Sequence, residues 1–198
     1  MTPTARIVLV AVAAGVAGIA ASLLTSGPGP LLRSEMGQRA LQAVVGANAP
    51  ATPEGLAVAQ RGDVIPTLRL KGLSGNIVEL PSDHAGRPLL INFWASWCGP
   101  CIQEMPELDR YAKAQGANGT QVVGIALDDA AAVQAFLQRT PVGYPILLDV
   151  AGPRDSGVQL GNPKGVLPYS VLVSADGRLL KQRIGPFVHG EIDGWTSH

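Results

Sequence analysis

Cys98 and Cys101 are the residues of this chain most suited to chemistry, and they are its only two cysteines. Two intervening residues allow a disulfide to close between them if the second cysteine lies one helical turn after the first. The motif therefore predicts a helix that starts near Cys98, and Pro100 suits the first turn of that helix, where its missing N–H costs nothing. At the positive end of the helix dipole the thiolate of Cys98 is favoured over the thiol, which would make Cys98 a nucleophile.

The elements that must position this pair are a strand before it and a helix after it. The run from Pro88 to Trp94 is apolar, branched and aromatic, and it predicts a buried strand. After the pair, apolar residues recur at helical spacing from Ile102 to Tyr111. The expected geometry is strand, short turn and helix.

The segment from Ile91 to Cys101 reads INFWASWCGPC and resembles the active-site signature of the thioredoxin superfamily. Asn92 stands where thioredoxin keeps a buried aspartate. Glu104 stands where the membrane-anchored TlpA/ResA-like thiol-disulfide reductases, which include cytochrome c maturation proteins, carry a functional glutamate. The resemblance covers residues 62–190 and implies a thioredoxin-like fold and disulfide chemistry.

The resemblance implies a role for each catalytic candidate. Cys98 would attack a disulfide, and Cys101 would resolve the resulting mixed disulfide. Glu104 lies near Cys101 by helical spacing, and burial would raise its pKa and let it pass a proton to or from Cys101. A surface carboxylate without a role is the alternative for Glu104, and an amide that only bonds within the strand layer is the alternative for Asn92.

Substrate contacts are expected on both sides of the cysteine pair. Trp97, Gly99 and Pro100 would shape the groove that receives a client. Leu167 and Pro168 precede a predicted strand and resemble the cis-proline loop that faces the cysteines in thioredoxin folds. Such a loop leaves the N–H and C=O of Leu167 free to pair with an extended chain. An ordinary trans proline at a strand start is the alternative.

The overall pattern predicts an α/β fold, a thioredoxin-like three-layer sandwich with a mixed sheet, an N-terminal β-hairpin and a central insertion. Asp128 and Asp129 precede a predicted helix, and helix N-capping explains them better than a metal or acid/base site. Only about two helical turns fit after Phe187. The expected elements are strands at 65–70 and 77–80, a strand at 121–127, a helix at 130–138, a strand at 144–149, a strand that follows Pro168 and runs to Val173, and a strand at 178–184.

The N-terminus predicts one transmembrane helix. From Ile7 to Leu24 there is no charge, and eighteen residues at ~1.5 Å each give ~27 Å, enough to cross a thin hydrocarbon core. The expected organisation is a membrane anchor or signal segment at 1–25, a juxtamembrane linker at 26–58 and the thioredoxin-like domain at 59–198. A signal peptide cleaved at the small residues that end this run is the alternative.

Composition argues against several classes of function. Fifteen basic and fifteen acidic residues give a net charge of zero, so nothing indicates a nucleic-acid partner. The chain has no second CxxC and no paired histidines to complete four zinc ligands, so we expect no metal. We expect no organic cofactor either, because the cysteine pair would be the redox centre. For His84, His189 and His198 we expect no catalytic role.

The expected function is that of a periplasmic thiol-disulfide oxidoreductase that reduces client proteins, for example in cytochrome c or copper-site maturation. The resemblance implies a DsbD/CcdA-like membrane thiol donor and an inner-membrane location, with a soluble periplasmic form if the signal is cleaved. The dipeptide Gly99-Pro100 favours a reducing couple by resemblance. A disulfide oxidase or isomerase is the enzyme alternative, and a non-catalytic client-binding module or a copper chaperone is the alternative of another class.

Overall fold

A seven-stranded mixed sheet organises the chain, with the strand order β2-β1-β5-β4-β3-β6-β7. The computed structural model describes residues 6–7, 32–47, 49–116 and 118–197. The strands are β1 (Leu68–Gly72), β2 (Ile77–Leu80), β3 (Leu89–Trp94), β4 (Gln121–Leu127), β5 (Ile146–Asp149), β6 (Tyr169–Val173) and β7 (Leu179–Ile184). The helices are α3 (Glu35–Ala47), α4 (Gly99–Ala114), α5 (Ala130–Arg139), α6 (Ser156–Gln159) and α7 (Glu191–Thr196), with a 3₁₀ turn at Ser82–His84.

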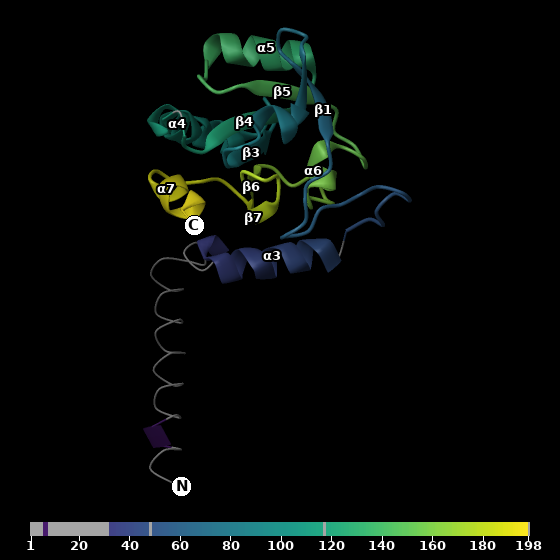
Figure 1. Cartoon of the computed structure of the whole chain (residues 1–198), viewed down its shortest axis with the longest axis vertical. Coiled ribbons are helices and arrows are strands. Elements are labelled where there is room, and N and C mark those ends of the chain that lie inside the picture. The colour runs from purple at the N-terminus through teal and green to yellow at the C-terminus, as the bar shows by residue number, and fades with distance from the viewer. Residues whose placement is uncertain (1–5, 8–31, 48, 117, 198) are drawn as a thin grey trace. The chain divides into compact units, whose positions relative to one another are not determined.

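The central strand is β3, which pairs parallel with β4 and antiparallel with β6. All six of its residues are buried, so the predicted buried strand is confirmed. The predicted N-terminal hairpin is confirmed too, because β1 and β2 pair antiparallel and β1 continues the sheet onto β5. Figure 1 shows β3 and β4 side by side, with α4 next to them.

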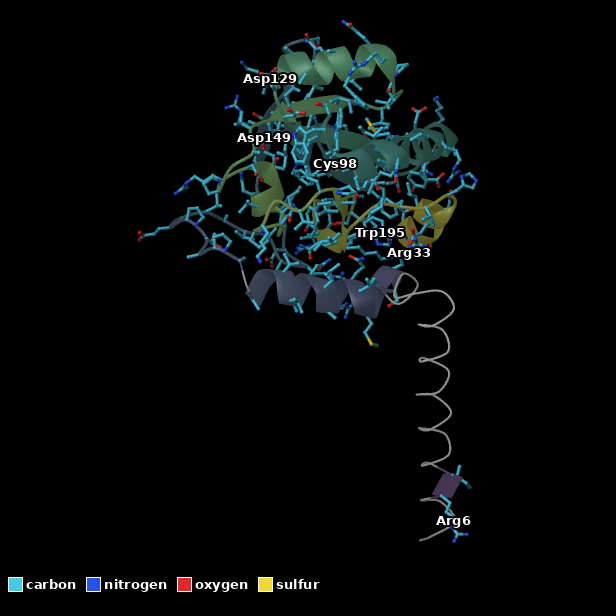
Figure 2. All side chains as sticks on the ribbon, turned by 180° about the vertical axis from the view of Figure 1, so that it is seen from behind. Arg6, Arg33, Cys98, Asp129, Asp149 and Trp195 are labelled. Atoms are coloured by element: carbon cyan, nitrogen blue, oxygen red, sulfur yellow. A yellow bond between two sulfur atoms is a disulfide. The ribbon has the colours of Figure 1, made fainter. Side chains whose placement is uncertain are left out.

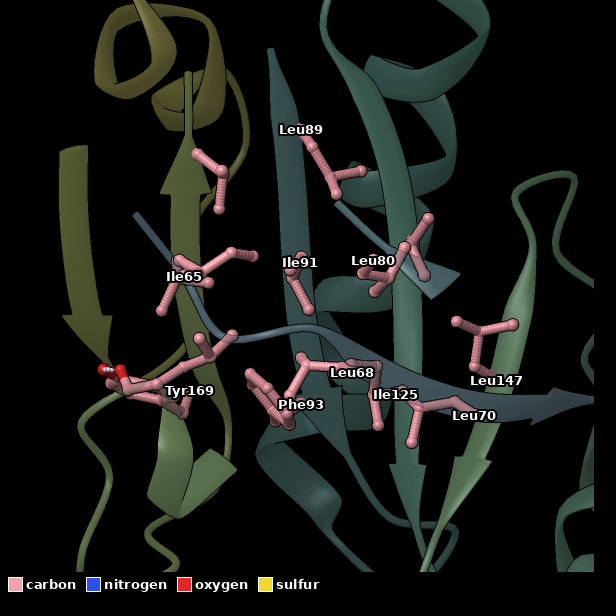
Figure 3. Close-up of a cluster of buried hydrophobic side chains, with 14 of the residues drawn as sticks. Ile65, Leu68, Leu70, Leu80, Leu89, Ile91, Phe93, Ile125, Leu147 and Tyr169 are labelled. Carbon is pink, nitrogen blue, oxygen red and sulfur yellow. Dashed lines mark hydrogen bonds between the residues drawn. The ribbon is translucent and has the colours of Figure 1, made fainter. Parts of the chain in front are cut away.

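Apolar clusters cover both faces of the sheet, as a layered α/β fold requires. On one face, Ile91 and Phe93 pack with Tyr169 from β6 and with Ile65, which precedes β1 (Figure 3). On the other face, Leu90 and Trp94 belong to a cluster that also contains both cysteines and side chains of α4, α5 and α7. The cysteine pair therefore lies where α4 packs on the central strand.

The predicted helix after the strand is confirmed. Its N-cap is Cys98, its first residue is Gly99, and Pro100 lies in its first turn. In Figure 2, Cys98 lies within the domain rather than at an end of the chain. This strand, turn and helix hold the cysteines at the end of β3.

The central insertion consists of β4, α5, β5 and α6, between α4 and Pro168. Asp129 caps α5, since its Oδ1 accepts hydrogen bonds from the N–H groups of Ala131 and Ala132. The prediction that Asp128 shares this capping role is wrong, because the Asp128 side chain accepts hydrogen bonds from Ser96 instead. At the C-terminal end, α7 has six residues, as the short terminal segment predicted.

The chain divides into two compact units, residues 1–43 and 44–198. The described part of the first unit is residues 6–7 and 32–43, and it includes the start of α3, within the segment 26–58 that the sequence indicates as a linker. Among the described residues no helix is both long enough and apolar enough to cross a membrane. The predicted membrane anchor falls almost entirely on residues 8–24, which lie outside the described residues.

Candidate active site

A disulfide joins Cys98 and Cys101 at the start of α4. Cys98 is 5% exposed and Cys101 is fully buried, so of the two cysteines only Cys98 reaches the surface. The N–H of Cys101 points at Cys98 Sγ at 3.3 Å. In the reduced state this donor and the helix dipole would stabilise a thiolate on Cys98.

Glu104 lies one helical turn after Cys101 and is 1% exposed. Its Oε1 accepts a hydrogen bond from Asn92 Nδ2 at 2.7 Å, and its Oε2 accepts one from the N–H of Phe187 at 2.8 Å. Burial raises the pKa of Glu104 to about 7, although the hydrogen bonds from Phe187 and Asn92 act in the opposite direction. A carboxyl group with this pKa exchanges protons readily near neutral pH.

Asn92 connects this carboxyl group to the sheet. Its Nδ2 also donates to Ser170 Oγ on β6 at 3.0 Å, while its Oδ1 has no hydrogen-bond partner among the described residues. The structure therefore brings Asn92 and Glu104 together, which the sequence analysis treated as two separate candidates. Helical spacing placed Glu104 near Cys101, but no sequence signal paired it with Asn92.

The peptide bond between Leu167 and Pro168 is cis, as the resemblance to the cis-proline loop implied. The Leu167 side chain packs against the cluster that contains both cysteines. Its backbone N–H and C=O make no hydrogen bond within the described ranges. These two groups are thus available to pair with an extended chain, in the manner of strand addition.

Asn162 holds this loop in place and was missed by the sequence analysis. It is 1% exposed, its Nδ2 donates to the C=O of Val166 at 2.9 Å, and its Oδ1 accepts from the N–H of Val166 at 3.0 Å. The side chain thereby satisfies both backbone groups of Val166, the residue before Leu167. Its sequence context, between Gly161 and Pro163, indicates only a turn.

Asp128, at the end of β4, holds the turn that precedes the cysteines. Its Oδ2 accepts hydrogen bonds from the N–H of Ser96 at 2.9 Å and from Ser96 Oγ at 2.6 Å. Burial raises the pKa of Asp128, but these hydrogen bonds outweigh burial and hold the pKa below its usual range. Asp128 is therefore a charged anchor for the turn that carries Trp97 and Cys98.

The remaining site candidates lie at the surface of this region. Trp97 is 70% exposed, and Gly99 and Pro100 are exposed beside it. The two described histidines contact other parts of the domain: His84 pairs with Gln121, and His189 pairs with Glu107. His198 lies outside the described residues.

Comparison with known proteins supports the interpretation of this geometry. The Redoxin family profile matches residues 60–194. The thiol-disulfide oxidoreductase ResA of Bacillus thuringiensis (strain Al Hakam) is 28% identical over 139 residues, which cover 69% of this chain and 76% of that protein. The sporulation thiol-disulfide oxidoreductase A of Bacillus subtilis (strain 168) is 25% identical over 131 residues, with coverages of 64% and 76%.

Solved structures share the fold. A protein from Chlorobium tepidum, assigned as a thiol:disulfide interchange protein DsbE, matches with a TM-score of 0.58 and 33% identity. The match covers 65% of this chain and 88% of that protein. StoA from Bacillus subtilis matches with a TM-score of 0.54 and 25% identity, covering 68% of this chain and 98% of that one.

Proposed function

The chain belongs to the Redoxin family and is a TlpA/ResA-like thiol-disulfide oxidoreductase of the thioredoxin superfamily, and from that premise we propose that it reduces disulfides in client proteins. The observation that carries the proposal is the position of the cysteine pair. Cys98 and Cys101 lie at a helix N-terminus, Glu104 follows Cys101 by one turn of that helix, and Leu167 packs against the apolar cluster that contains both cysteines. A nucleophile, a resolving thiol, a proton acceptor and a backbone docking site are thus combined.

The first proposed step is attack on the client. The thiolate of reduced Cys98 forms a bond with one sulfur of the client disulfide, and the S–S bond of the client breaks. One client sulfur leaves as a thiolate and takes a proton, while the other stays bound to Cys98 as a mixed disulfide. Trp97, Gly99 and Pro100 would border the attacked bond, and the backbone of Leu167 would align the client beside it.

The second proposed step releases the client. Glu104 takes the thiol proton of Cys101, directly or through water, and the resulting thiolate attacks Cys98 Sγ. The mixed disulfide breaks, the second client sulfur leaves as a thiolate that takes up a proton, and the Cys98–Cys101 disulfide forms. Two electrons pass from the enzyme dithiol to the client disulfide in each cycle. The cysteine pair is the whole redox centre in this scheme, so the proposal needs no cofactor or metal.

The source of electrons and the cellular location are part of the proposal. We place the domain in the periplasm, tethered to the inner membrane by the predicted anchor at 1–25 or released from it by cleavage. A DsbD/CcdA-like membrane dithiol would reduce the Cys98–Cys101 disulfide again. Cytochrome c or copper-site proteins are the proposed clients. The support for these points is the resemblance to the TlpA/ResA-like reductases and the apolar N-terminal run.

The reduction potential of the cysteine pair tests the direction of electron flow. The full-length chain in detergent is equilibrated in graded dithiol buffers, and the fluorescence of the tryptophans is followed. We expect a value at or below about −270 mV, the potential of thioredoxin. A value above about −180 mV would identify an oxidase or isomerase instead. A pair without any reversible transition would favour a non-catalytic client-binding module.

A further inference from the structure

A groove of about 890 Å³ opens beside the cysteine pair. Trp97 and Leu167, the residues that border the redox site, contribute to its lining. The rest of the lining comes from Leu127 at the end of β4 and from two segments distant in sequence: residues 49–53, ahead of the hairpin, and residues between 151 and 165. Because Trp97 directly precedes Cys98, a client segment in this groove would lie close to the site where its disulfide would react.

Hydrogen bonds fix the walls of this groove. Arg154 Nη2 donates to the C=O of Glu54 at 3.0 Å, and the N–H of Ala59 donates to the C=O of Gln159 at 2.8 Å. These bonds hold the segment after residue 53 against the insertion. The lining also contains four prolines, at positions 50, 53, 153 and 163, which have restricted backbones and no N–H. Such walls lose little conformational entropy when a ligand binds, and they offer apolar contact rather than backbone pairing.

One exposed charged side chain lines the groove. Of its lining residues only Asp155 and Lys164 are charged. Both carboxylate oxygens of Asp155 are occupied, by the N–H of Val158 at 2.8 Å and the N–H of Gly152 at 3.0 Å. Lys164 is exposed and forms no ion pair or hydrogen bond with any residue that the structure describes. The groove therefore combines apolar walls with a buried carboxylate that is held by backbone N–H groups and an exposed ammonium group that is open to a ligand.

We propose that this groove selects clients by the sequence around the reactive cysteine: an extended segment with a large apolar side chain and a carboxylate. The apolar side chain would pack beside Trp97, and the carboxylate would face Lys164. The inference rests on the proposed function and names the client class for that site. Burial of one large apolar side chain corresponds to at least a tenfold gain in kcat/KM, and a rim ion pair to about two- to fivefold.

Synthetic peptides test the selection directly. The substrates are nonapeptides whose central cysteine forms a mixed disulfide with glutathione. The full-length protein reduces each peptide, and the kcat/KM for each peptide is divided by the kcat/KM of the same protein for oxidised glutathione. One position next to the cysteine carries either Leu or Ser, and another carries either Glu or Lys. We expect the Leu/Glu peptide to be reduced at least tenfold faster than the Ser/Glu peptide and two- to fivefold faster than the Leu/Lys peptide, the latter difference decreasing with salt.

Two variants with matched controls assign the selection to the groove. Ala151→Trp would fill the groove and abolish the preference for Leu, whereas Val150→Trp would keep it, because Val150 is 82% exposed and outside the lining. Lys164→Glu would reverse the preference from Glu to Lys. Lys71→Glu makes the same change of charge on β1, away from the groove, and would not reverse it.

The outcomes separate the inference from the function on which it rests. If the protein reduces oxidised glutathione and all the peptides equally well, the inference about the groove is overturned, while the proposed reductase function stands. A preference that survives both Ala151→Trp and Lys164→Glu would also overturn it. Loss of reduction with every disulfide would refute the reductase itself. A groove covered by a second copy of the chain would appear as a dimer that Ala151→Trp dissociates, without peptide preference, and this result too would overturn the inference.

Discussion

Asn92 on β3 and Glu104 on α4 are joined by a hydrogen bond of 2.7 Å between the amide nitrogen and one carboxylate oxygen. The second oxygen of Glu104 accepts from the backbone of Phe187, so one carboxyl group links the central strand, the cysteine helix and the C-terminal segment. Position 92 carries an amide, which does not titrate. The ionisable group near the cysteines is therefore the carboxyl group of Glu104 on the helix. The proposed proton transfer and the stability of the domain would therefore depend on the same side chain.

Glu104→Gln should change how stability depends on pH. The pKa of Glu104 rises from 4.5 to about 7 on folding, which corresponds to about 3 kcal/mol. Because the folded state holds the proton more tightly, the wild type should lose stability as pH rises from about 4.5 to 7. The glutamine variant should lack this loss and be the more stable protein at pH 8. Urea unfolding at several pH values measures the difference.

The control for this experiment is Glu107→Gln. The pKa of Glu107 is lowered to about 2, so this carboxylate stays ionised from pH 5 to pH 8 and should not alter the slope in that range. A Glu104→Gln variant with the wild-type slope would show that Glu104 titrates at its ordinary value. Such a result would also remove Glu104 as the proton acceptor for Cys101.

Asp128→Ala should slow disulfide reduction as well as destabilise the fold. The variant loses two hydrogen bonds to a charged group, so we expect a cost of about 1.5–3 kcal/mol and a displaced turn ahead of Cys98. Asp129→Ala is the matched control. It removes the N-cap of α5, which should lower the free energy of unfolding by about 1 kcal/mol, and the lost hydrogen bonds are within α5 rather than to that turn. Stopped-flow reduction of oxidised glutathione should be slower only for Asp128→Ala. If both variants reduce oxidised glutathione at the same rate, the role of Asp128 is purely structural.

Glu107→Gln should weaken the attachment of the C-terminal segment to α4. The carboxylate accepts hydrogen bonds from Arg110, from the N–H of Gly190 and from His189, and the Arg110 bond is the largest cause of its lowered pKa. A lowered pKa stabilises the fold above the ordinary value of 4.5, and this stabilisation disappears as pH falls toward 2. The variant should therefore be less stable at pH 7 and equal to the wild type near pH 2. Thermal unfolding across this range measures it, and a constant difference would contradict the assignment.

The local features of the site could be predicted from the sequence, because each depends on neighbouring residues. A continuous apolar run identifies β3, and Pro100 in the first turn agrees with a helix that starts after Cys98. The cis bond before Pro168 could be expected only from the resemblance to the thioredoxin superfamily. The hydrogen bonds around Asn92 and Glu104 depend instead on how the strands pair in the sheet. Asn92 reaches Ser170 only because β3 and β6 pair in the register that places these two residues opposite each other.

Side chains that anchor loops are harder to predict, since their partners are distant in the chain. Asp128 looks like a helix cap in sequence, yet its carboxylate accepts hydrogen bonds from Ser96, 32 residues earlier. Asn162 looks like a turn residue, yet it is buried and holds the loop before Leu167. Residues 49–53 were assigned to a linker by their composition, yet they line the groove beside Trp97. Tertiary contacts decide these roles.

Cys101→Ser should trap the protein in a mixed disulfide, which distinguishes the roles of the two cysteines. Cys98, the more exposed of the two cysteines, would attack oxidised glutathione and remain bound to one glutathione because no second thiol can release it. The matched variant Cys98→Ser leaves only the fully buried Cys101, which should react far more slowly. Mass spectrometry without reductant detects the adduct. Adduct formation that is faster in Cys98→Ser would reverse the assignment, because Cys101 would then be the nucleophile and Glu104 would lie beside the attacking sulfur.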